Sequence, residues 1–246
     1  NREFAWAMGV AFIFGLGNFA MAYAVPVFGQ LVQGMSPLDA GLVLLPSGIV
    51  VVALLPFMGR MADRIKPHYA IIAGLLLFAI GTVPLADADV NTAFIAIAIY
   101  GIINRLGVSL TQPFIITVSL RTLPPDKLNS GAGTMNFIRQ LGGSLGINAW
   151  VVFLEMRTHY HADVLAATQS SDNEASRALL SSVGQILGEA GVSETVLQSG
   201  ALHYLGQVIH AQAATLGFQD GFWVLVAAYL VGIWPAWMLG RRAKRK

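Results

Sequence analysis

Cysteine is absent from the sequence, and charged residues are scarce. Without cysteine the chain can form no disulfide, no thiolate nucleophile and no zinc–thiolate site. Only 11% of the 246 residues are charged whereas 55% are hydrophobic, which is too apolar a composition for an ordinary soluble domain. Because charges are costly in hydrocarbon, their confinement to the stretches between long apolar runs predicts an integral membrane protein.

Motifs for catalysis and for metal binding are also missing. The sequence contains no HExxH, no phosphate-binding glycine loop and no paired catalytic acids. Two groups of histidines invite a metal site, but no acid completes either at a convincing spacing. They are His159 with His161, and, on one predicted helical face, His203, Gln207 and His210. We therefore expect no metal, no cofactor and no enzymatic activity. The isoelectric point of 9.1 comes with no basic face, so we expect no nucleic acid partner.

Six apolar runs are long enough to cross a membrane. A hydrocarbon core of about 30 Å takes about 20 helical residues. The fold class expected is an all-α membrane protein with six transmembrane helices. The predicted spans are residues 4–32, 38–58, 69–86, 93–119, 130–154 and 218–239.

Lysine and arginine gather on one side of this arrangement, and most acids lie on the other. By the positive-inside rule the basic side is cytoplasmic, and both termini lie on it. The basic side holds Arg2, Arg60, Arg64, Lys66, Arg121, Lys127 and the basic residues of 241–246.

Residues 156–217 form a long polar connection on the opposite, extracytoplasmic side. Two stretches of it, EASRALLSSVGQIL and TVLQSGALHYLGQVIHAQ, repeat apolar residues at helical spacing. Ser171 and Asp172 are candidate caps for the first stretch. We interpret the connection as amphipathic helices folded over the span ends, with a place on the membrane surface or a docked partner as alternatives.

Two arginines fall inside predicted spans, Arg105 near the middle of the fourth and Arg139 about ten residues into the fifth. An ionisable residue at such depth faces a cavity or a partner rather than lipid. Arginine stays protonated, so neither can be the titrating group of a proton-coupled carrier. The spans offer no deep carboxylate, so that group is expected outside this chain. A role in a cavity or in coupling, and a purely structural pairing, both remain open for the arginines.

Polar and aromatic groups on the first, fourth and fifth spans would face a path between helices. For each of them a hydrogen bond between helices explains the residue as well as a contact with substrate does. A large apolar cavity with few such groups suits lipophilic cations or neutral drugs. The candidate path residues are Asn18, Tyr23, Gln30, Tyr100, Asn104, Arg105, Gln112, Asn136, Arg139 and Gln140. Gly142 and Gly146 form a GxxxG pair that favours close helix packing.

The stretch GRMADRIKP, residues 59–67, joins the second and third predicted spans. Its Gly59, Asp63 and Arg64 resemble the cytoplasmic Gly-x-x-x-Asp-Arg signature of major facilitator superfamily transporters, although Lys66-Pro67 departs from the usual pattern. PVFGQLVQGMSPLDAGLVLLPSG and LPPDKLNSGAGTMNFIRQLGGSLG are similar to the C-terminal half of the fourteen-span drug:proton antiporters of the EmrB/QacA type. With the long outer connection, the resemblance covers essentially the whole chain.

This resemblance implies the C-terminal bundle of a major facilitator fold, built as a 3+3 inverted repeat of units 1–90 and 91–246. It implies proton-coupled export of drugs by alternating access against an N-terminal bundle of the same transporter. Gly59, Asp63 and Arg64 would act in the conformational change. The implied location is a bacterial cytoplasmic membrane, and in Gram-negative relatives the further partners are an extracytoplasmic adaptor protein and an outer-membrane channel.

Two alternatives remain. One is an exporter of the same family that carries an anionic metabolite or siderophore, which the two arginines would suit better than a cation. The other is a six-span membrane enzyme or assembly factor that uses the histidine-bearing outer connection. A closely spaced acid and histidine set would favour this second alternative.

Overall fold

The computed structural model describes residues 2–61, 65–121, 123–169 and 173–243, and within them it contains helices and no strand. Two short 3₁₀ segments, η1 (Val83–Asp87) and η2 (Pro125–Lys127), accompany the α-helices. The α-helices are α1 (Arg2–Leu31), α2 (Pro37–Leu42), α3 (Leu45–Met61), α4 (Pro67–Thr82), α5 (Phe94–Arg121), α6 (Leu128–Ala167), α7 (Glu174–Glu189) and α8 (Glu194–Ala243).

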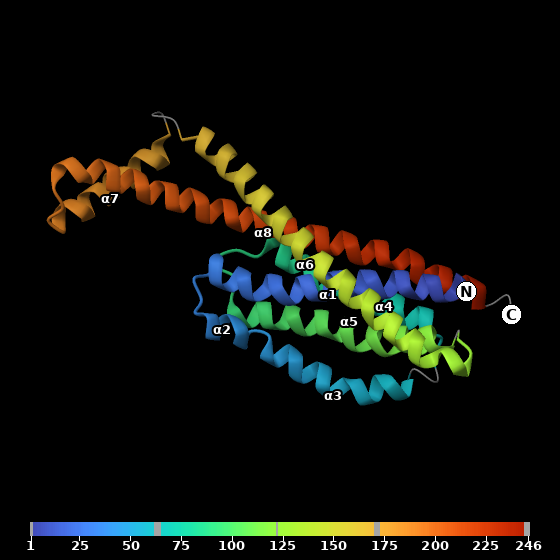
Figure 1. The fold of residues 1–246 in the computed structure, drawn as a ribbon. Coiled ribbons are helices and arrows are strands. Elements are labelled where there is room, and N and C mark those ends of the chain that lie inside the picture. The colour runs from blue at the N-terminus through green and yellow to red at the C-terminus, as the bar shows by residue number, and fades with distance from the viewer. Residues whose placement is uncertain (1, 62–64, 122, 170–172, 244–246) are drawn as a thin grey trace.

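Six helical segments are long and apolar enough to cross a membrane, which confirms the predicted fold class and the number of spans. They lie side by side in one bundle, and the first turn of α1 and the last turn of α8 lie at the same end of it (Figure 1). The membrane-length segments are Arg2–Leu31, Pro37–Met61, Pro67–Asp87, Phe94–Arg121, Pro125–Ala167 and Val196–Arg241.

The second span differs from the single helix predicted over residues 38–58, because it is broken between α2 and α3. Ser36 caps α2, and its hydroxyl oxygen accepts the N–H of Asp39 at 3.1 Å. Pro46 then lies at the second position of α3. Proline lacks an N–H and its ring crowds the carbonyl group one turn earlier, so it is best tolerated in the first turn of a helix and favours the start of a new helix here.

The long outer connection is where the prediction was wrong. Helix α6 does not end near residue 154 but continues to Ala167, and α8 begins at Glu194 rather than near residue 218. The first amphipathic stretch is confirmed as α7, but the second is the beginning of α8 rather than a separate helix. No proline interrupts the chain between Glu194 and Pro235, so nothing in the sequence stops α8 where its hydropathy falls.

We call residues 156–217 the outer arm. With 40 residues in α6 and 50 in α8, these helices are about 60 and 75 Å long, well beyond the thickness of about 30 Å of a hydrocarbon core. They leave the bundle together, and α7 packs along α8 (Figure 1). Asn173 caps α7 by accepting the N–H of Ser176, whereas the predicted caps Ser171 and Asp172 lie outside the described residues.

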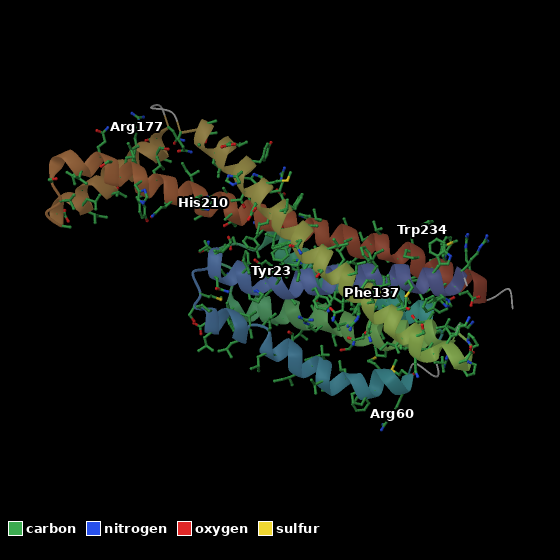
Figure 2. The ribbon with its side chains drawn as sticks, viewed as in Figure 1. Tyr23, Arg60, Phe137, Arg177, His210 and Trp234 are labelled. Atoms are coloured by element: carbon green, nitrogen blue, oxygen red, sulfur yellow. The ribbon has the colours of Figure 1, made fainter. Side chains whose placement is uncertain are left out.

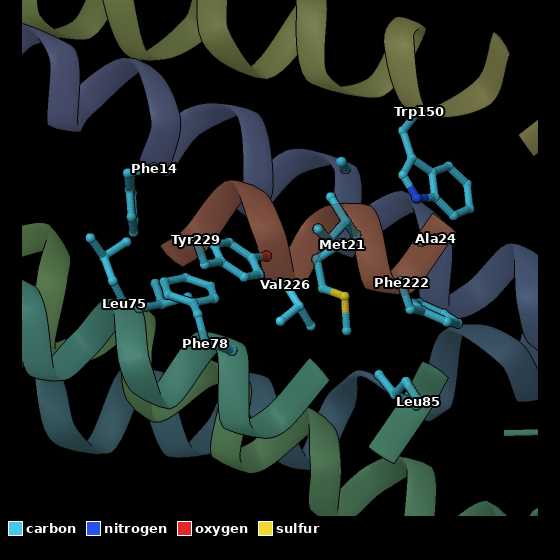
Figure 3. Close-up of a cluster of buried hydrophobic side chains, with 14 of the residues drawn as sticks. Phe14, Met21, Ala24, Leu75, Phe78, Leu85, Trp150, Phe222, Val226 and Tyr229 are labelled. Atoms are coloured by element: carbon cyan, nitrogen blue, oxygen red, sulfur yellow. The ribbon is translucent and has the colours of Figure 1, made fainter. Parts of the chain in front are cut away.

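The core of the bundle is built from aromatic side chains of α1, α4, α5 and α8. Tyr229 is fully buried and stacks on Phe78 with a centroid separation of 4.7 Å, and Phe14 meets the edge of Phe78 at 5.8 Å (Figure 3). Such ring pairs add about 0.5–1.5 kcal/mol to the burial of their area. Because α8 packs on α1, α4 and α6, this core holds the last span in place.

Helices α1 and α6 approach so closely that their backbones touch. A Cβ atom added to Gly142 would collide with the carbonyl oxygen of Phe12, and one added to Gly146 would lie 2.5 Å from the carbonyl oxygen of Leu16. From the other side, a Cβ on Gly15 would meet the carbonyl group of Arg139. The backbone around Arg139 is therefore fixed against α1.

Candidate functional site

Arg105 reaches from α5 to α1 in the interior of the bundle. Its Nη1 atom donates to Oδ1 of Asn18 at 3.0 Å, and its side chain is partly buried. Among the described residues no carboxylate forms an ion pair with it. The partner that the structure shows for this charge is therefore a neutral amide and not a carboxylate.

Arg139 lies on α6 beside a small cavity between α1, α5 and α6. Its Nη2 atom donates to Oδ1 of Asn136 at 3.1 Å, whereas its Nε atom is buried and has no hydrogen-bond partner among the described residues. The cavity has a volume of about 30 Å³, and its lining residues are Phe14, Gln112, Ile115, Ile116, Met135, Asn136 and Arg139. Two amides and a guanidinium thus meet among apolar walls.

The two arginines lie on the same flank of the bundle. On α1, Asn18 follows Phe14 by one helical turn, and on α5, Gln112 follows Arg105 by two. At 1.5 Å per residue these intervals place the two guanidinium groups about 6–10 Å apart along the helix axes. We call Asn18, Arg105, Gln112, Asn136 and Arg139 the two-arginine site. Of the ten candidate path residues, the structure brings Gln112, Asn136 and Arg139 to one cavity and pairs Asn18 with Arg105.

The other candidate path residues lie elsewhere. Asn104 is buried and its Nδ2 atom donates to Oγ1 of Thr82 at 3.1 Å, so it bridges α5 and α4. Tyr23 is 39% exposed and lies edge-on to Trp150, and Gln30 bonds back to its own helix at the carbonyl oxygen of Pro26. Tyr100 packs at the edge of the hydrophobic core, and Gln140 is exposed.

A buried tyrosine that the sequence analysis missed lies next to this site. The hydroxyl of Tyr229 donates to the carbonyl oxygen of Gly17 at 2.9 Å, and the ring occupies the space that a side chain at Gly17 would need. Gly17 directly precedes Asn18, so this contact positions the partner of Arg105. A tyrosine inside an apolar span is the signal that could have found it, since its hydroxyl needs a partner when buried.

A second missed group joins α6 to α8 at the base of the outer arm. Asp220 Oδ2 accepts the Nε–H of Arg157 at 2.7 Å and also lies 2.7 Å from Nε2 of His161. The guanidinium of Arg157 lies over the ring of Tyr160 at 4.7 Å. The spacing of Arg157 and His161 by one helical turn was readable in the sequence, but their common partner 59 and 63 residues away was not.

The remaining motif residues take no part in these groups. Gly59 is exposed on α3 with open space around it, and Asp63 and Arg64 lie outside the described residues. Arg60 projects away from the bundle (Figure 2). On the outer arm, Nε2 of His203 lies 3.2 Å from Nε2 of Gln207, and the described residues contain no cluster of three or more histidine or acidic side chains that could hold a metal ion.

Comparison with known proteins agrees with this architecture. Residues 1–147 match the family model described as Major Facilitator Superfamily. An uncharacterized MFS-type transporter, YhcA, of Bacillus subtilis is 24% identical over 81% of this chain and 38% of its own length. The multidrug export protein EmrB of Haemophilus influenzae is 26% identical over 92% of this chain and 43% of its own length. The chain thus spans about two fifths of the length of these relatives.

A solved structure shares the fold. It is a bacterial homologue of the human lysosomal transporter Spinster in an inward-facing and occupied conformation, with a TM-score of 0.67 and 16% sequence identity. The match covers 98% of this chain and 49% of that one. The chain therefore belongs to the major facilitator superfamily, a family of membrane transporters, and its relatives include EmrB-type multidrug exporters.

Proposed function

We propose that this chain is the C-terminal half of a proton-coupled multidrug exporter that works by alternating access in a bacterial cytoplasmic membrane. The multidrug and colistin resistance functions carried in the names of its EmrB relatives support drug export. The two-arginine site carries the proposal within this chain, since charged and polar groups inside a membrane bundle mark a substrate or ion pathway.

The proposed architecture is a pair of three-span units, residues 1–90 and 91–246, related as an inverted repeat. Both termini would lie on the cytoplasmic side, as the distribution of lysine and arginine favours. Their position at one end of the bundle, opposite the outer arm, is consistent with this orientation (Figure 1). The group that binds the coupling proton would lie outside this chain, because neither arginine of the site can titrate.

An N-terminal bundle of the same transporter is the proposed partner of the exposed apolar faces. On α6, Phe137, Leu141, Leu145 and Val152 recur on one side and are 40–65% exposed. On α3, Ile49, Val52 and Phe57 are similarly uncovered. Figure 2 shows Phe137 on the face of α6 that the other helices leave open. The two-arginine site would then lie between the bundles and open to each side in turn.

The outer arm is proposed to meet an extracytoplasmic adaptor protein, which would connect the transporter to an outer-membrane channel. The arm extends beyond the membrane-spanning bundle and exposes apolar side chains, among them Val164, Ile186 and Leu202. Exposed apolar residues on a rigid projecting element favour contact with another protein.

Export of a fluorescent dye tests the proposed function. Cells that express the full transporter are loaded with the uncharged dye Nile red, and its export is followed with and without a protonophore. We expect Arg105→Ala to abolish export while membrane insertion and abundance stay normal, because the path loses the side chain that links α5 to Asn18 of α1. Arg177→Ala removes an exposed arginine of α7 and is the matched control. Undiminished export by the Arg105 variant for every substrate tried would contradict the proposed role of the site.

The enzyme alternative gains one observation, since His161 and Asp220 form the close acid and histidine pair that it requires. The same carboxylate oxygen is also bonded to Arg157, so the group acts as a clamp between two helices. Membership in a transporter family favours transport. The alternative of an anionic cargo is favoured by the Nε atom of Arg139, which has no hydrogen-bond partner among the described residues.

A further inference from the structure

We propose that the two-arginine site binds a carboxylate group through the guanidinium of Arg139. The proposal rests on the proposed function, because it assigns a class of ligand to the same path between the bundles. It deepens that function by stating which chemical group the site is built to hold.

Arg139 has hydrogen-bond donors that the described residues do not use. A guanidinium carries five N–H donors. In this structure one bond is made, from Nη2 to Oδ1 of Asn136, and the Nε atom is buried with no acceptor. The Arg139 side chain as a whole is only partly buried, so an acceptor from outside the described residues can reach the guanidinium and use these donors.

The guanidinium of Arg139 and the residues around it match a carboxylate in shape and charge. The planar fork of a guanidinium matches the two oxygens of a carboxylate. Gln112 and Asn136 line the same cavity and can offer amide N–H groups, and the other lining residues are apolar. Arg139 is the one charged residue among the described residues that line this cavity, so a second negative charge of a dianion such as phosphate would have no direct ion-pair partner there. At about 30 Å³ the cavity has room for a carboxylate group alone, so the apolar body that carries this group would lie outside the cavity.

Arg105 supplies a second fixed charge close by. It lies one to two helical turns away on the same flank and is bonded to the neutral Asn18, so its field adds to that of Arg139. Arginine keeps its charge throughout the physiological pH range. The site therefore stays positive in every state of the transport cycle, and only its ligand can change charge with pH.

The carboxylate has two sources of the same chemistry. It can belong to the cargo, or it can be an acidic side chain of the transporter outside residues 1–246. In the first case the site selects acidic lipophilic compounds. In the second case it is a charge pair that forms between the two bundles.

The test uses the full transporter in lipid nanodiscs and a pair of probes that differ in charge alone. Binding of 1-naphthylacetate and of its neutral amide, 1-naphthylacetamide, is measured by calorimetry at pH 7. The proteins are the wild type, Arg139→Gln, Arg139→Lys and the control Arg177→Gln on α7. Thermal unfolding of the same proteins without probe is followed from pH 2.5 to pH 8, and size-exclusion profiles establish that each variant is folded.

If the carboxylate belongs to the cargo, the wild type and the control bind the acid at least about tenfold more tightly than the amide, as a charge-assisted fork implies. Arg139→Gln loses this preference, and Arg139→Lys keeps part of it because it retains the charge without the fork. If the carboxylate belongs to the transporter, the wild type shows no preference. Its unfolding temperature then exceeds that of Arg139→Gln at pH 7, and the difference shrinks as the pH falls below about 4, where the paired acid becomes protonated.

The carboxylate site would be overturned if the wild type bound the acid and the amide equally and if the difference in unfolding temperature between the wild type and Arg139→Gln did not depend on pH. Nile red export by the wild type and by Arg105→Ala separates this failure from that of the proposed function. Export that still requires Arg105 would leave the transporter proposal intact while the carboxylate site falls.

Discussion

The carboxylate oxygen Oδ2 of Asp220 on α8 accepts the Nε–H of Arg157 on α6 at 2.7 Å and thereby joins the two helices at the base of the outer arm. His161 approaches the same oxygen from one turn further along α6. The two long helices carry the arm, so this contact determines the angle at which the arm leaves the bundle.

The first prediction concerns this contact. Asp220→Asn keeps the shape of the side chain but removes its charge, so the bonds to Arg157 and His161 weaken. Because both Arg157 and Asp220 are about one third exposed, we expect a loss of only about 1 kcal/mol in stability. We also expect a broader distribution of arm positions. Since this chain has no cysteine, spin labels at Arg177→Cys on the arm and Leu38→Cys on the bundle can report that distribution directly.

Glu155→Gln is the control for the Asp220 variant. Glu155 is an exposed acid of α6, and its change should leave the distance distribution as in the wild type. Equal distributions for Asp220→Asn and the wild type would contradict a clamp at this position.

The spans were predictable from the sequence because their signal is local. About 20 consecutive apolar residues specify a membrane helix whatever packs against it. The helices of the outer arm were not predictable in the same way. A fall in hydropathy marks the end of an apolar environment and not the end of a helix. From Glu194 to Phe218 the chain retains helical residues and no proline, so α8 continues through the point where its surroundings change.

The site was predictable in composition but not in its pairings. The depth of Arg105 and Arg139 in apolar runs singled them out. The neutral group that each arginine bonds depends on how α1, α5 and α6 pack. Asn104, also a candidate path residue, instead bonds to Thr82 of α4. The clamp of Arg157 and Asp220 joins residues 63 positions apart and has no local signal.

The second prediction tests the contact of α1 with α6. Gly142→Ala adds a Cβ atom that collides with the carbonyl oxygen of Phe12, and backbone cannot move aside as a flexible side chain could. We expect a loss of about 1–3 kcal/mol in stability, measured by thermal unfolding in detergent. Gly133→Ala on the same helix is the matched control, since a Cβ there meets open space. It should be neutral or slightly stabilising, because alanine favours a helix more than glycine does.

The third prediction concerns the buried hydroxyl of Tyr229. Tyr229→Phe keeps the ring stacked on Phe78 but removes the hydrogen bond to the carbonyl oxygen of Gly17. We expect a loss of about 1 kcal/mol in stability, since one neutral hydrogen bond is removed. Asn18 should also become less well positioned for Arg105, which would lower dye export in part. Tyr204→Phe on the outer arm removes an exposed hydroxyl and should change neither property.

The last prediction is a pH dependence in the loop between η1 and α5. Hydrogen bonds from the hydroxyl of Thr92 and the N–H of Asn91 hold the pKa of Asp89 below its usual value of 3.8. Gln33 at the end of α1 fixes the same loop by donating to the carbonyl oxygens of Asp89 and Thr92. A lowered folded-state pKa stabilises the loop above pH 3.8, and this stabilisation is lost as the pH falls through the folded-state value.

Hydrogen exchange of the loop, compared between proteins at one pH so that intrinsic rates cancel, checks this dependence. At pH 7, Asp89→Ala should exchange the amides of Asn91 and Thr92 faster than the wild type does. At pH 3 that difference should shrink, because the wild-type carboxylate is then increasingly protonated and accepts more weakly. Asp87→Ala changes a neighbouring exposed acid and should match the wild type at both pH values. An undiminished difference at pH 3 would mean that the loop depends on the shape of Asp89 and not on its charge.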